Sequence, residues 1–201
     1  MVDEEILLEI ENEIEEYEEM FGGHEGRNGV CMAPGKYPEI KVSGPNRYYA
    51  ELLMEDYAGA VSELTAIHQY VHHHIVFGSE YKELAELEEC IARSEMEHLE
   101  IIGELIKLLG EDPRFCTVEN NEEVCWSPAA VYYGSNVCDR LAADIAGEKA
   151  AIKNYSQHYK VIDDPYIKAV LSRIINDEQY HVYRLYKAMQ KYGCIESHFR
   201  S

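Results

Sequence analysis

Apolar side chains recur at helical spacing along most of this chain, and the spacing breaks where glycine and proline gather. Between residues 3 and 20 they return every three or four positions on an acidic background, which predicts an amphipathic helix. The same period predicts four longer helices, over residues 47–76, 80–109, 137–161 and 165–192. No segment alternates convincingly between apolar and polar residues, so we expect no strands. The pattern indicates an all-α protein.

Breaker residues set the connections between the four long helices. Gly78 ends the first helix and Gly110 ends the second. Pro165 suits the first turn of the fourth helix, and Gly193 ends it. The connections are therefore a short turn, a long crossover of about residues 110–136 and a second short turn. This is the connectivity of an antiparallel four-helix bundle with one long crossover between helices two and three.

The chain divides into three expected segments. The first, 1–46, is an N-terminal acidic helix followed by an irregular arm that is rich in glycine and proline. The second, 47–192, is the four-helix bundle, and the third, 193–201, is a C-terminal tail. The apolar stripe of the acidic helix needs cover, which favours packing on another subunit and hence a homo-oligomer.

One spacing rule occurs twice in the bundle. A glutamate on the first helix of each hairpin is followed, 32 or 30 residues later, by the first residue of a Glu-x-x-His triplet. The two sets are Glu63 with Glu95 and His98, and Glu148 with Glu178 and His181. In each hairpin the turn lies about midway between the two glutamates, so both should stand at the same level of the bundle. The i, i+3 spacing puts each Glu and His on one face of its helix.

These side chains lie within the apolar stripes of their helices, where a carboxylate is costly unless it is compensated. Four carboxylates at one level balance the charge of two divalent cations, and two neutral imidazoles complete the ligand set. The sequence therefore predicts a dinuclear metal site in a four-helix bundle. A ligand histidine also needs an acceptor for its second ring nitrogen, and Asp177 is the candidate acceptor for His98.

Other polar residues near the ligands receive plainer interpretations. Glu97 lies between two ligands but should point away from the site. The run His72–His74 lies near a helix end, where cations interact with the helix dipole. Tyr70 and Tyr155 share the ligand faces two turns away, and we interpret them as core aromatics rather than redox relays.

Composition limits the classes of partner that the chain is expected to bind. The net charge of −20 argues against binding nucleic acid or anionic membranes. The first apolar cluster is too short and too acidic for a secretory signal, and no stretch approaches a membrane span, so a cytoplasmic protein is the default. Without a signal, we expect the six cysteines to be reduced thiols. An oxidant-responsive or metal-binding role stays open for Cys116, Cys125 and Cys138, and Cys31 has no assigned role.

The ligand pattern resembles the ferritin-like di-metal carboxylate superfamily, and within it the rubrerythrin-like and manganese-catalase-like groups. The resemblance covers about residues 47–192 and is carried by Glu63, Ser94–His98, Gly147-Glu148 and Asp177–His181. It implies that Glu63 and His98 bind one metal ion, that Glu148 and His181 bind the other, and that Glu95 bridges them. It implies for Glu178 either a second bridge or a proton acceptor beside the site, and thus a catalytic role.

Three departures bear on the reaction. Rubrerythrins carry a further glutamate where this chain has Ala151, and a rubredoxin centre whose paired cysteines are missing here. Both weaken a peroxidase interpretation, because the usual route for electrons is gone. Manganese catalases tend to have a basic residue where this chain has Gly147, which leaves that assignment open. A storage cage is disfavoured, because the acidic arm and the long crossover resemble neither type of cage subunit.

The leading hypothesis is an oxidoreductase that acts on hydrogen peroxide or dioxygen at two manganese or two iron ions per chain. Manganese-catalase-like disproportionation of peroxide suits it best, because that reaction needs no electron donor. The alternatives are a rubrerythrin-like peroxidase, a ferroxidase or iron-handling protein, and a structural metal-binding component, for instance of a spore coat. The sequence does not choose manganese over iron, because both accept Glu and His ligands.

Overall fold

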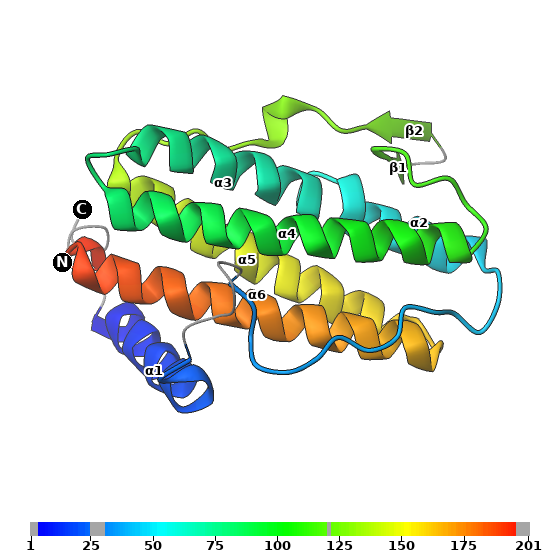
Figure 1. The fold of residues 1–201 in the computed structure, drawn as a ribbon, viewed down its shortest axis with the longest axis horizontal. Coiled ribbons are helices and arrows are strands. Elements are labelled where there is room, and N and C mark those ends of the chain that lie inside the picture. The colour runs from blue at the N-terminus through cyan, green and yellow to red at the C-terminus, as the bar shows by residue number, and fades with distance from the viewer. Residues whose placement is uncertain (1–3, 25–30, 120–121, 196–201) are drawn as a thin grey trace.

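The computed structural model describes residues 4–24, 31–119 and 122–195. A helical bundle dominates it, with a small two-stranded sheet on one side (Figure 1). The helices and strands are α1 (Glu4–Phe21), α2 (Arg47–Ala58), α3 (Glu63–Phe77), α4 (Lys82–Leu108), β1 (Cys116–Glu119), β2 (Glu122–Cys125), a 3-10 turn (Pro128–Ala130), α5 (Val137–Val161) and α6 (Pro165–Lys191). The expected all-α bundle is thereby confirmed.

Two antiparallel hairpins build the bundle. Helix α3 packs along α4, α5 packs along α6, and the crossover from the end of α4 to α5 runs over the outside of the bundle (Figure 1). The turns have local causes. Gly78 between α3 and α4 has a φ of 47°, which favours glycine. Asp164 caps α6 by accepting the N–H of Tyr166 at 2.9 Å, and Pro165 follows at the first helical position.

The first bundle helix is interrupted, so the predicted continuous helix over residues 47–76 is wrong. Helix α2 ends at Ala58 and α3 begins at Glu63. Ser62 starts α3, because its hydroxyl oxygen accepts the N–H of Thr65 at 3.3 Å while its O–H donates to the carbonyl of Gly59 at 2.8 Å. The interruption makes Glu63 the first residue of a helix and opens the bundle wall beside it.

The crossover contains strands, so the expectation of no strands is also wrong. Strands β1 and β2 pair antiparallel, with Cys116 opposite Cys125 and Val118 opposite Glu123. Each strand is only four residues long, which is too short for alternation to be recognised in the sequence. The hairpin lies over α2 and covers that end of the bundle (Figure 1).

The prediction of reduced thiols is wrong as well. The structure pairs all six cysteines, as Cys31–Cys90, Cys116–Cys125 and Cys138–Cys194. The prediction relied on compartment, but the fold brings partners together that lie 59 and 56 residues apart, with Cα atoms at 5.2 and 5.1 Å. One disulfide ties the N-terminal arm to α4, one closes the β-hairpin, and one joins the start of α5 to the segment after α6.

Helix α1 packs on its own chain. Its buried stripe, which includes Ile14, Tyr17 and Phe21, lies against α6, and the ring of Phe21 stands 5.4 Å from that of Tyr180. Lys149 adds an ion pair to Glu13 at 2.6 Å. The stripe is therefore covered within the chain, which removes the reason for expecting another subunit there. None of the helices in the described segments is both long and apolar enough to cross a bilayer.

The core consists of two apolar clusters with a polar layer between them. One cluster gathers around α1 and the adjoining ends of α3–α6, and includes Ile91 and Leu185. The other gathers around α2 and the opposite end of the bundle, and includes Ile102 and Leu171. Between Ile91 and Ile102 on α4 stand Glu95 and His98, both buried. The break between the clusters is where the predicted ligands lie.

Candidate metal centre

The structure brings the six predicted ligands together. They form two buried groups, and within each group the donor atoms all lie within 4.8 Å of one another. The first group is Glu63, Glu95, His98 and Glu178, and the second is Glu95, Glu148, Glu178 and His181. Glu95 and Glu178 belong to both groups, whereas each remaining Glu and His belongs to one. Every one of the six side chains is at most 4% exposed.

One nitrogen of each histidine points into the carboxylates. His98 Nδ1 lies 3.1 Å from oxygens of both Glu95 and Glu178, and 3.5 Å from Glu63. His181 Nδ1 lies 2.9 Å from Glu95, 3.1 Å from Glu178 and 3.5 Å from Glu148. A single ring nitrogen cannot donate to three carboxylates at once. The arrangement is the one expected when an ion stands among these oxygens and the nitrogen.

The other nitrogen of each histidine has its own acceptor. His98 Nε2 lies 3.3 Å from Asp177 Oδ2, and His181 Nε2 lies 2.7 Å from the carbonyl oxygen of Cys31. With the Nε2 proton donated outward, Nδ1 keeps its lone pair toward the carboxylates. Lone pairs facing each other at about 3 Å repel, so a neutral imidazole in this orientation needs a cation between them.

Asp177 is itself held firmly. Its carboxylate accepts the backbone N–H of Ala33 at 2.7 Å, the hydroxyl of Tyr37 at 2.5 Å, and a guanidinium N–H of Arg173. Burial alone would raise the pKa of Asp177, but the bonds to His98 and Tyr37 and the charge of Arg173 lower it. Asp177 therefore stays ionised beside His98. Because Ala33 and Tyr37 belong to the N-terminal arm, the arm helps to orient a predicted ligand, His98.

Two tyrosines anchor the outer carboxylates, which the sequence interpretation missed. The hydroxyl of Tyr70 on α3 donates to Glu148 Oε1 on α5, and the hydroxyl of Tyr155 on α5 donates to Glu63 Oε1 on α3. Both rings are buried in the core, as expected. Each tyrosine follows the glutamate of its own helix by seven residues and bonds the glutamate of the other. That shared spacing is the signal from which the contact could have been found.

The electrostatics fit a pair of divalent cations. Burial and repulsion between neighbouring carboxylates raise the pKa of Glu63 and Glu148 well above the usual range. Burial would also raise the pKa of Glu95, but the adjacent His181 and His98 lower it. Among the described residues, Glu63 Oε2, Glu95 Oε1 and Glu178 Oε1 are buried without a hydrogen-bond partner. Orphaned carboxylate oxygens beside histidine lone pairs are the donor set that Mn²⁺ and Fe²⁺ accept.

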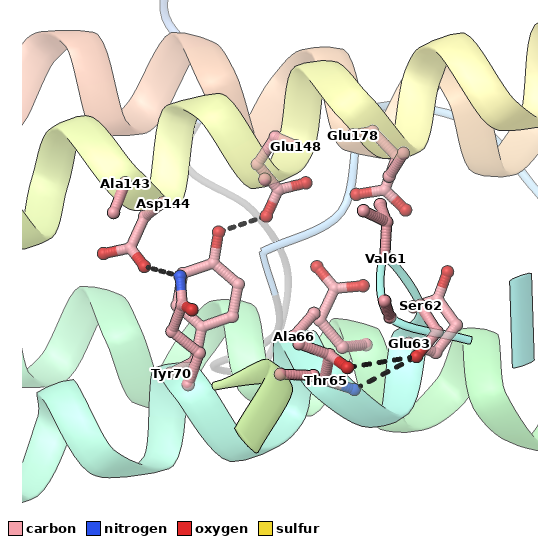
Figure 2. Close-up of a pocket in the computed structure, with 16 residues that line it drawn as sticks. Val61, Ser62, Glu63, Thr65, Ala66, Tyr70, Ala143, Asp144, Glu148 and Glu178 are labelled. Atoms are coloured by element: carbon pink, nitrogen blue, oxygen red, sulfur yellow. Dashed lines mark hydrogen bonds between the residues drawn. The ribbon is translucent and has the colours of Figure 1, made fainter. Parts of the chain in front are cut away.

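A cavity of about 150 Å³ reaches this cluster. Its wall includes exposed residues of the α2–α3 interruption, Ala60 and Val61, and all four buried glutamates of the cluster. Figure 2 shows Glu148 and Glu178 extending into the cavity, with Tyr70 reaching across from the opposite wall to Glu148. The interruption of the first bundle helix thus provides an opening from the surface to the carboxylates.

The remaining residues considered from sequence lie apart from the cluster. Glu97 is exposed, as expected. His74 sits in the last turn of α3 and bonds the carbonyl of Ala85 at 2.7 Å. His72 is half-buried against the ring of Tyr133. His73 departs from the helix-end interpretation, because it is completely buried among other polar side chains.

Comparison with known proteins identifies the family. Residues 60–194 match the ferritin-like domain, so the chain belongs to the ferritin-like family. It is similar to the bacterioferritin of Desulfovibrio desulfuricans, with 36% identity over 124 residues that cover 60% of this chain and 64% of that protein. It is also similar to a probable manganese catalase of Clostridium acetobutylicum, with 26% identity over 171 residues that cover 76% of this chain and 75% of that protein.

A solved structure extends the comparison. A manganese catalase from Anabaena matches with a TM-score of 0.73 and 25% sequence identity, over 81% of each chain. The match to the bacterioferritin spans just under two thirds of that protein's length. The superfamily resemblance drawn from the ligand pattern is thereby confirmed, with both a manganese-catalase and a bacterioferritin branch among the similar proteins.

Proposed function

We propose that the chain is a dinuclear manganese or iron oxidoreductase that disproportionates hydrogen peroxide. The observation that carries the proposal is the pair of four-residue ligand groups that share Glu95 and Glu178. In this proposal, Glu63 and His98 hold one ion, and Glu148 and His181 hold the other. The likeness to a manganese catalase and to a probable manganese catalase supports it. When bound, a metal pair supplies two neighbouring Lewis-acid and redox centres for the two oxygens of peroxide.

The chain's own residues would manage the protons. A peroxide molecule oxidised to dioxygen gives up two protons, and a second one reduced to water takes up two. Glu178 lines the cavity and has an oxygen with no hydrogen-bond partner among the described residues, so it can hold a proton between the two halves of the cycle. Tyr70 and Tyr155 keep Glu148 and Glu63 oriented while this happens.

Electron supply favours disproportionation over peroxide reduction. A peroxidase needs a reductant for each turnover, and rubrerythrin-type chains are expected to receive electrons through paired cysteines that bind iron. This sequence has no Cys-x-x-Cys pair, and all six of its cysteines are joined in disulfides. Disproportionation uses peroxide as both oxidant and reductant, so the residues present are sufficient for it.

Iron oxidation is the second candidate, and the 36% identity to a bacterioferritin supports it. The same ligands accept Fe²⁺, and dioxygen fits the same cavity. The two functions differ in their products. Catalase turnover releases dioxygen from peroxide without consuming metal, whereas a ferroxidase consumes Fe²⁺ and dioxygen and accumulates ferric iron.

The test uses the metal-stripped chain reloaded separately with Mn²⁺ and with Fe²⁺ under anaerobic conditions. An oxygen electrode then follows peroxide addition, and absorbance follows iron oxidation in air. We expect dioxygen release from the manganese form and loss of most of that release in Glu178→Gln, and elemental analysis of the variant separates lost metal from lost proton transfer. Iron oxidation without dioxygen release would favour the second candidate. If metal binds and raises the melting temperature but neither reaction occurs, the result would favour a structural role, such as that of a coat component.

Assembly and location remain parts of the proposal. We infer self-association from the outer face of α3, where Val71, Ile75 and Val76 are exposed together, and light scattering tests it.

Two locations are expected from sequence, the cytoplasm and a spore coat. The three disulfides favour a compartment more oxidising than the cytoplasm.

A further inference from the structure

A third buried polar group lies outside the dinuclear cluster. It consists of His73 on α3, Glu88 on α4 and Asp144 on α5, whose donor atoms all lie within 4.8 Å of one another. None of the three side chains is more than 1% exposed. Glu88 precedes Glu95 by seven residues and Asp144 precedes Glu148 by four, so both share the core-facing sides of their helices with the dinuclear ligands.

Glu88 is the part of this group that lacks an explanation. Both of its carboxylate oxygens are fully buried and have no hydrogen-bond partner among the described residues. Burial, with repulsion from Asp144 and Glu148, raises the pKa of Glu88 well above its usual range. A buried carboxylate without any donor is strongly destabilising unless a cation or a proton neutralises it.

His73 repeats the orientation of the two ligand histidines. Its Nε2 lies 3.0 Å from the carbonyl oxygen of Tyr132, so that nitrogen donates its proton away from the group. Its Nδ1 faces Asp144 Oδ2 at 2.9 Å. This is the arrangement of His98 and His181, in which a backbone or carboxylate oxygen fixes Nε2 and leaves Nδ1 toward carboxylates.

The crossover holds the group in place. Gln69 donates its amide N–H to Asp144 Oδ1 at 2.8 Å, and its amide oxygen accepts the backbone N–H of Tyr132 at 2.9 Å. Tyr132 therefore orients both His73 and, through Gln69, Asp144. Among the described residues, His73 is then the one partner of Asp144 Oδ2, and neither oxygen of Glu88 has a hydrogen-bond donor. Such orientation before binding is typical of a metal site.

We propose that His73, Glu88 and Asp144 bind a third cation, a divalent transition metal such as Mn²⁺ or Fe²⁺. One imidazole and two carboxylates form a mixed nitrogen and oxygen set, and their combined charge balances one divalent ion. Asp144 also lines the cavity that reaches the dinuclear cluster, so the third ion borders the same space (Figure 2). This position suits an ion that is stored beside the dinuclear centre, either before it enters that centre or after it leaves.

A cation-free arrangement is the competing state. In it, a proton on Glu88 replaces the ion, and a doubly protonated His73 pairs with Asp144. The two states differ in how they respond to Glu88→Gln, because glutamine reproduces a protonated carboxyl group but is a poor ligand for Mn²⁺.

The experiment counts manganese ions on the full chain. Protein stripped with a chelator is dialysed against Mn²⁺ alone, and bound metal is measured by elemental analysis. We expect about three ions per chain in the wild type, about two in Glu88→Gln, and about three in Glu86→Gln, an exposed change on the same helix. Two ions in all three proteins would overturn the proposal. Because the count does not depend on turnover, it stands or falls separately from the proposed peroxide chemistry.

A second measurement covers a variant that fails to fold. Circular dichroism identifies that failure, and crystals of the manganese-loaded wild type then decide. An anomalous difference peak among His73, Glu88 and Asp144 supports the third site, whereas density at the dinuclear cluster with none among these three side chains overturns it.

Discussion

Tyr70 of α3 donates its hydroxyl proton to Glu148 of α5, across the bundle from its own helix. Tyr155 of α5 makes the reciprocal bond to Glu63 of α3. The two helices thus exchange donors, and each outer glutamate keeps one oxygen fixed and turns the other toward the histidines. A carboxylate oriented in advance loses less conformational freedom when it binds an ion.

Removing one of these hydroxyls tests that role. Tyr70→Phe leaves the ring packed but frees Glu148 Oε1, so we expect manganese affinity to fall about 10- to 100-fold, as for other changes beside metal ligands. Competition against a fluorescent chelator measures the affinity. Tyr159→Phe, on the outer face of α5, is the matched control and should bind like the wild type. Equal affinity in all three proteins would mean that Tyr70 only packs.

Asp177 should matter through charge rather than size. Asp177→Asn keeps the shape but removes the carboxylate that accepts from His98 Nε2, Ala33 and Tyr37. We expect metal affinity to fall about 10- to 100-fold, while the exposed change Asp163→Asn has little effect. Isothermal titration with Mn²⁺ compares them. An Asp177→Asn protein that binds as tightly as the wild type would show that His98 needs no charged acceptor.

The cysteine pairing can be tested by counting free thiols. Protein from native cells, alkylated at lysis and then denatured without reductant, should show essentially no free thiol, because the structure joins all six cysteines. After reduction, mass spectrometry should find all six alkylated. Six alkylated thiols before reduction would restore the reduced state expected from sequence and return the cytoplasm as the favoured location.

The contribution of the Asp164 cap to the free energy of unfolding should depend on pH in a defined direction. Asp164 accepts the N–H groups of Ser43 at 2.6 Å and Tyr166 at 2.9 Å. Although partial burial alone would raise the pKa of Asp164, these backbone donors lower it. A lowered carboxyl pKa adds stability above the pKa of the unfolded chain, and that stability is lost as pH falls through the folded pKa.

Asp164→Asn keeps an acceptor but loses the charge. We expect it to be less stable than the wild type by about 0.5 to 1 kcal/mol near pH 6. In urea unfolding experiments, the difference should shrink as pH falls below the carboxyl pKa of the unfolded chain and through the lowered pKa of folded Asp164, because the wild-type charge is progressively lost. A difference that stays constant with pH would show that shape, rather than charge, matters at this cap.

The buried cluster of Glu and His side chains and three of the four long helices could be predicted from sequence, because each depends on local spacing. A period of 3.6 residues placed Glu95, His98, Glu178 and His181 on core faces, and glycine and proline marked the turns. The same reasoning could have flagged Glu88 and Asp144, which lie one or two turns from ligands on the same faces. His73 was obscured by its neighbours, because a run of three histidines at a helix end has a simpler interpretation.

The features that the sequence did not predict depend on contacts between distant segments. Disulfide partners are chosen by the fold, and no local pattern pairs Cys31 with Cys90. The interruption before Glu63 arises from the hydrogen bonds of Ser62, a residue that also occurs inside helices. Nothing in the sequence indicated that the arm reaches the cluster, yet the carbonyl oxygen of Cys31 lies 2.7 Å from His181 Nε2. Ala33 and Tyr37 both donate to Asp177, which lies beside His98.

The central claim is that the four buried glutamates of the cluster need cations. Calorimetry of chelator-stripped and manganese-loaded protein tests it, with Glu95→Ala and the exposed Glu97→Ala as a matched pair. A thousandfold excess of Mn²⁺ over Kd should stabilise the wild type and Glu97→Ala by about 4 kcal/mol, which raises Tm by roughly 10 °C for a chain of this size. Glu95→Ala should lose most of that rise. A wild-type Tm that is unchanged by metal, or a rise equally large in Glu95→Ala, would contradict the account.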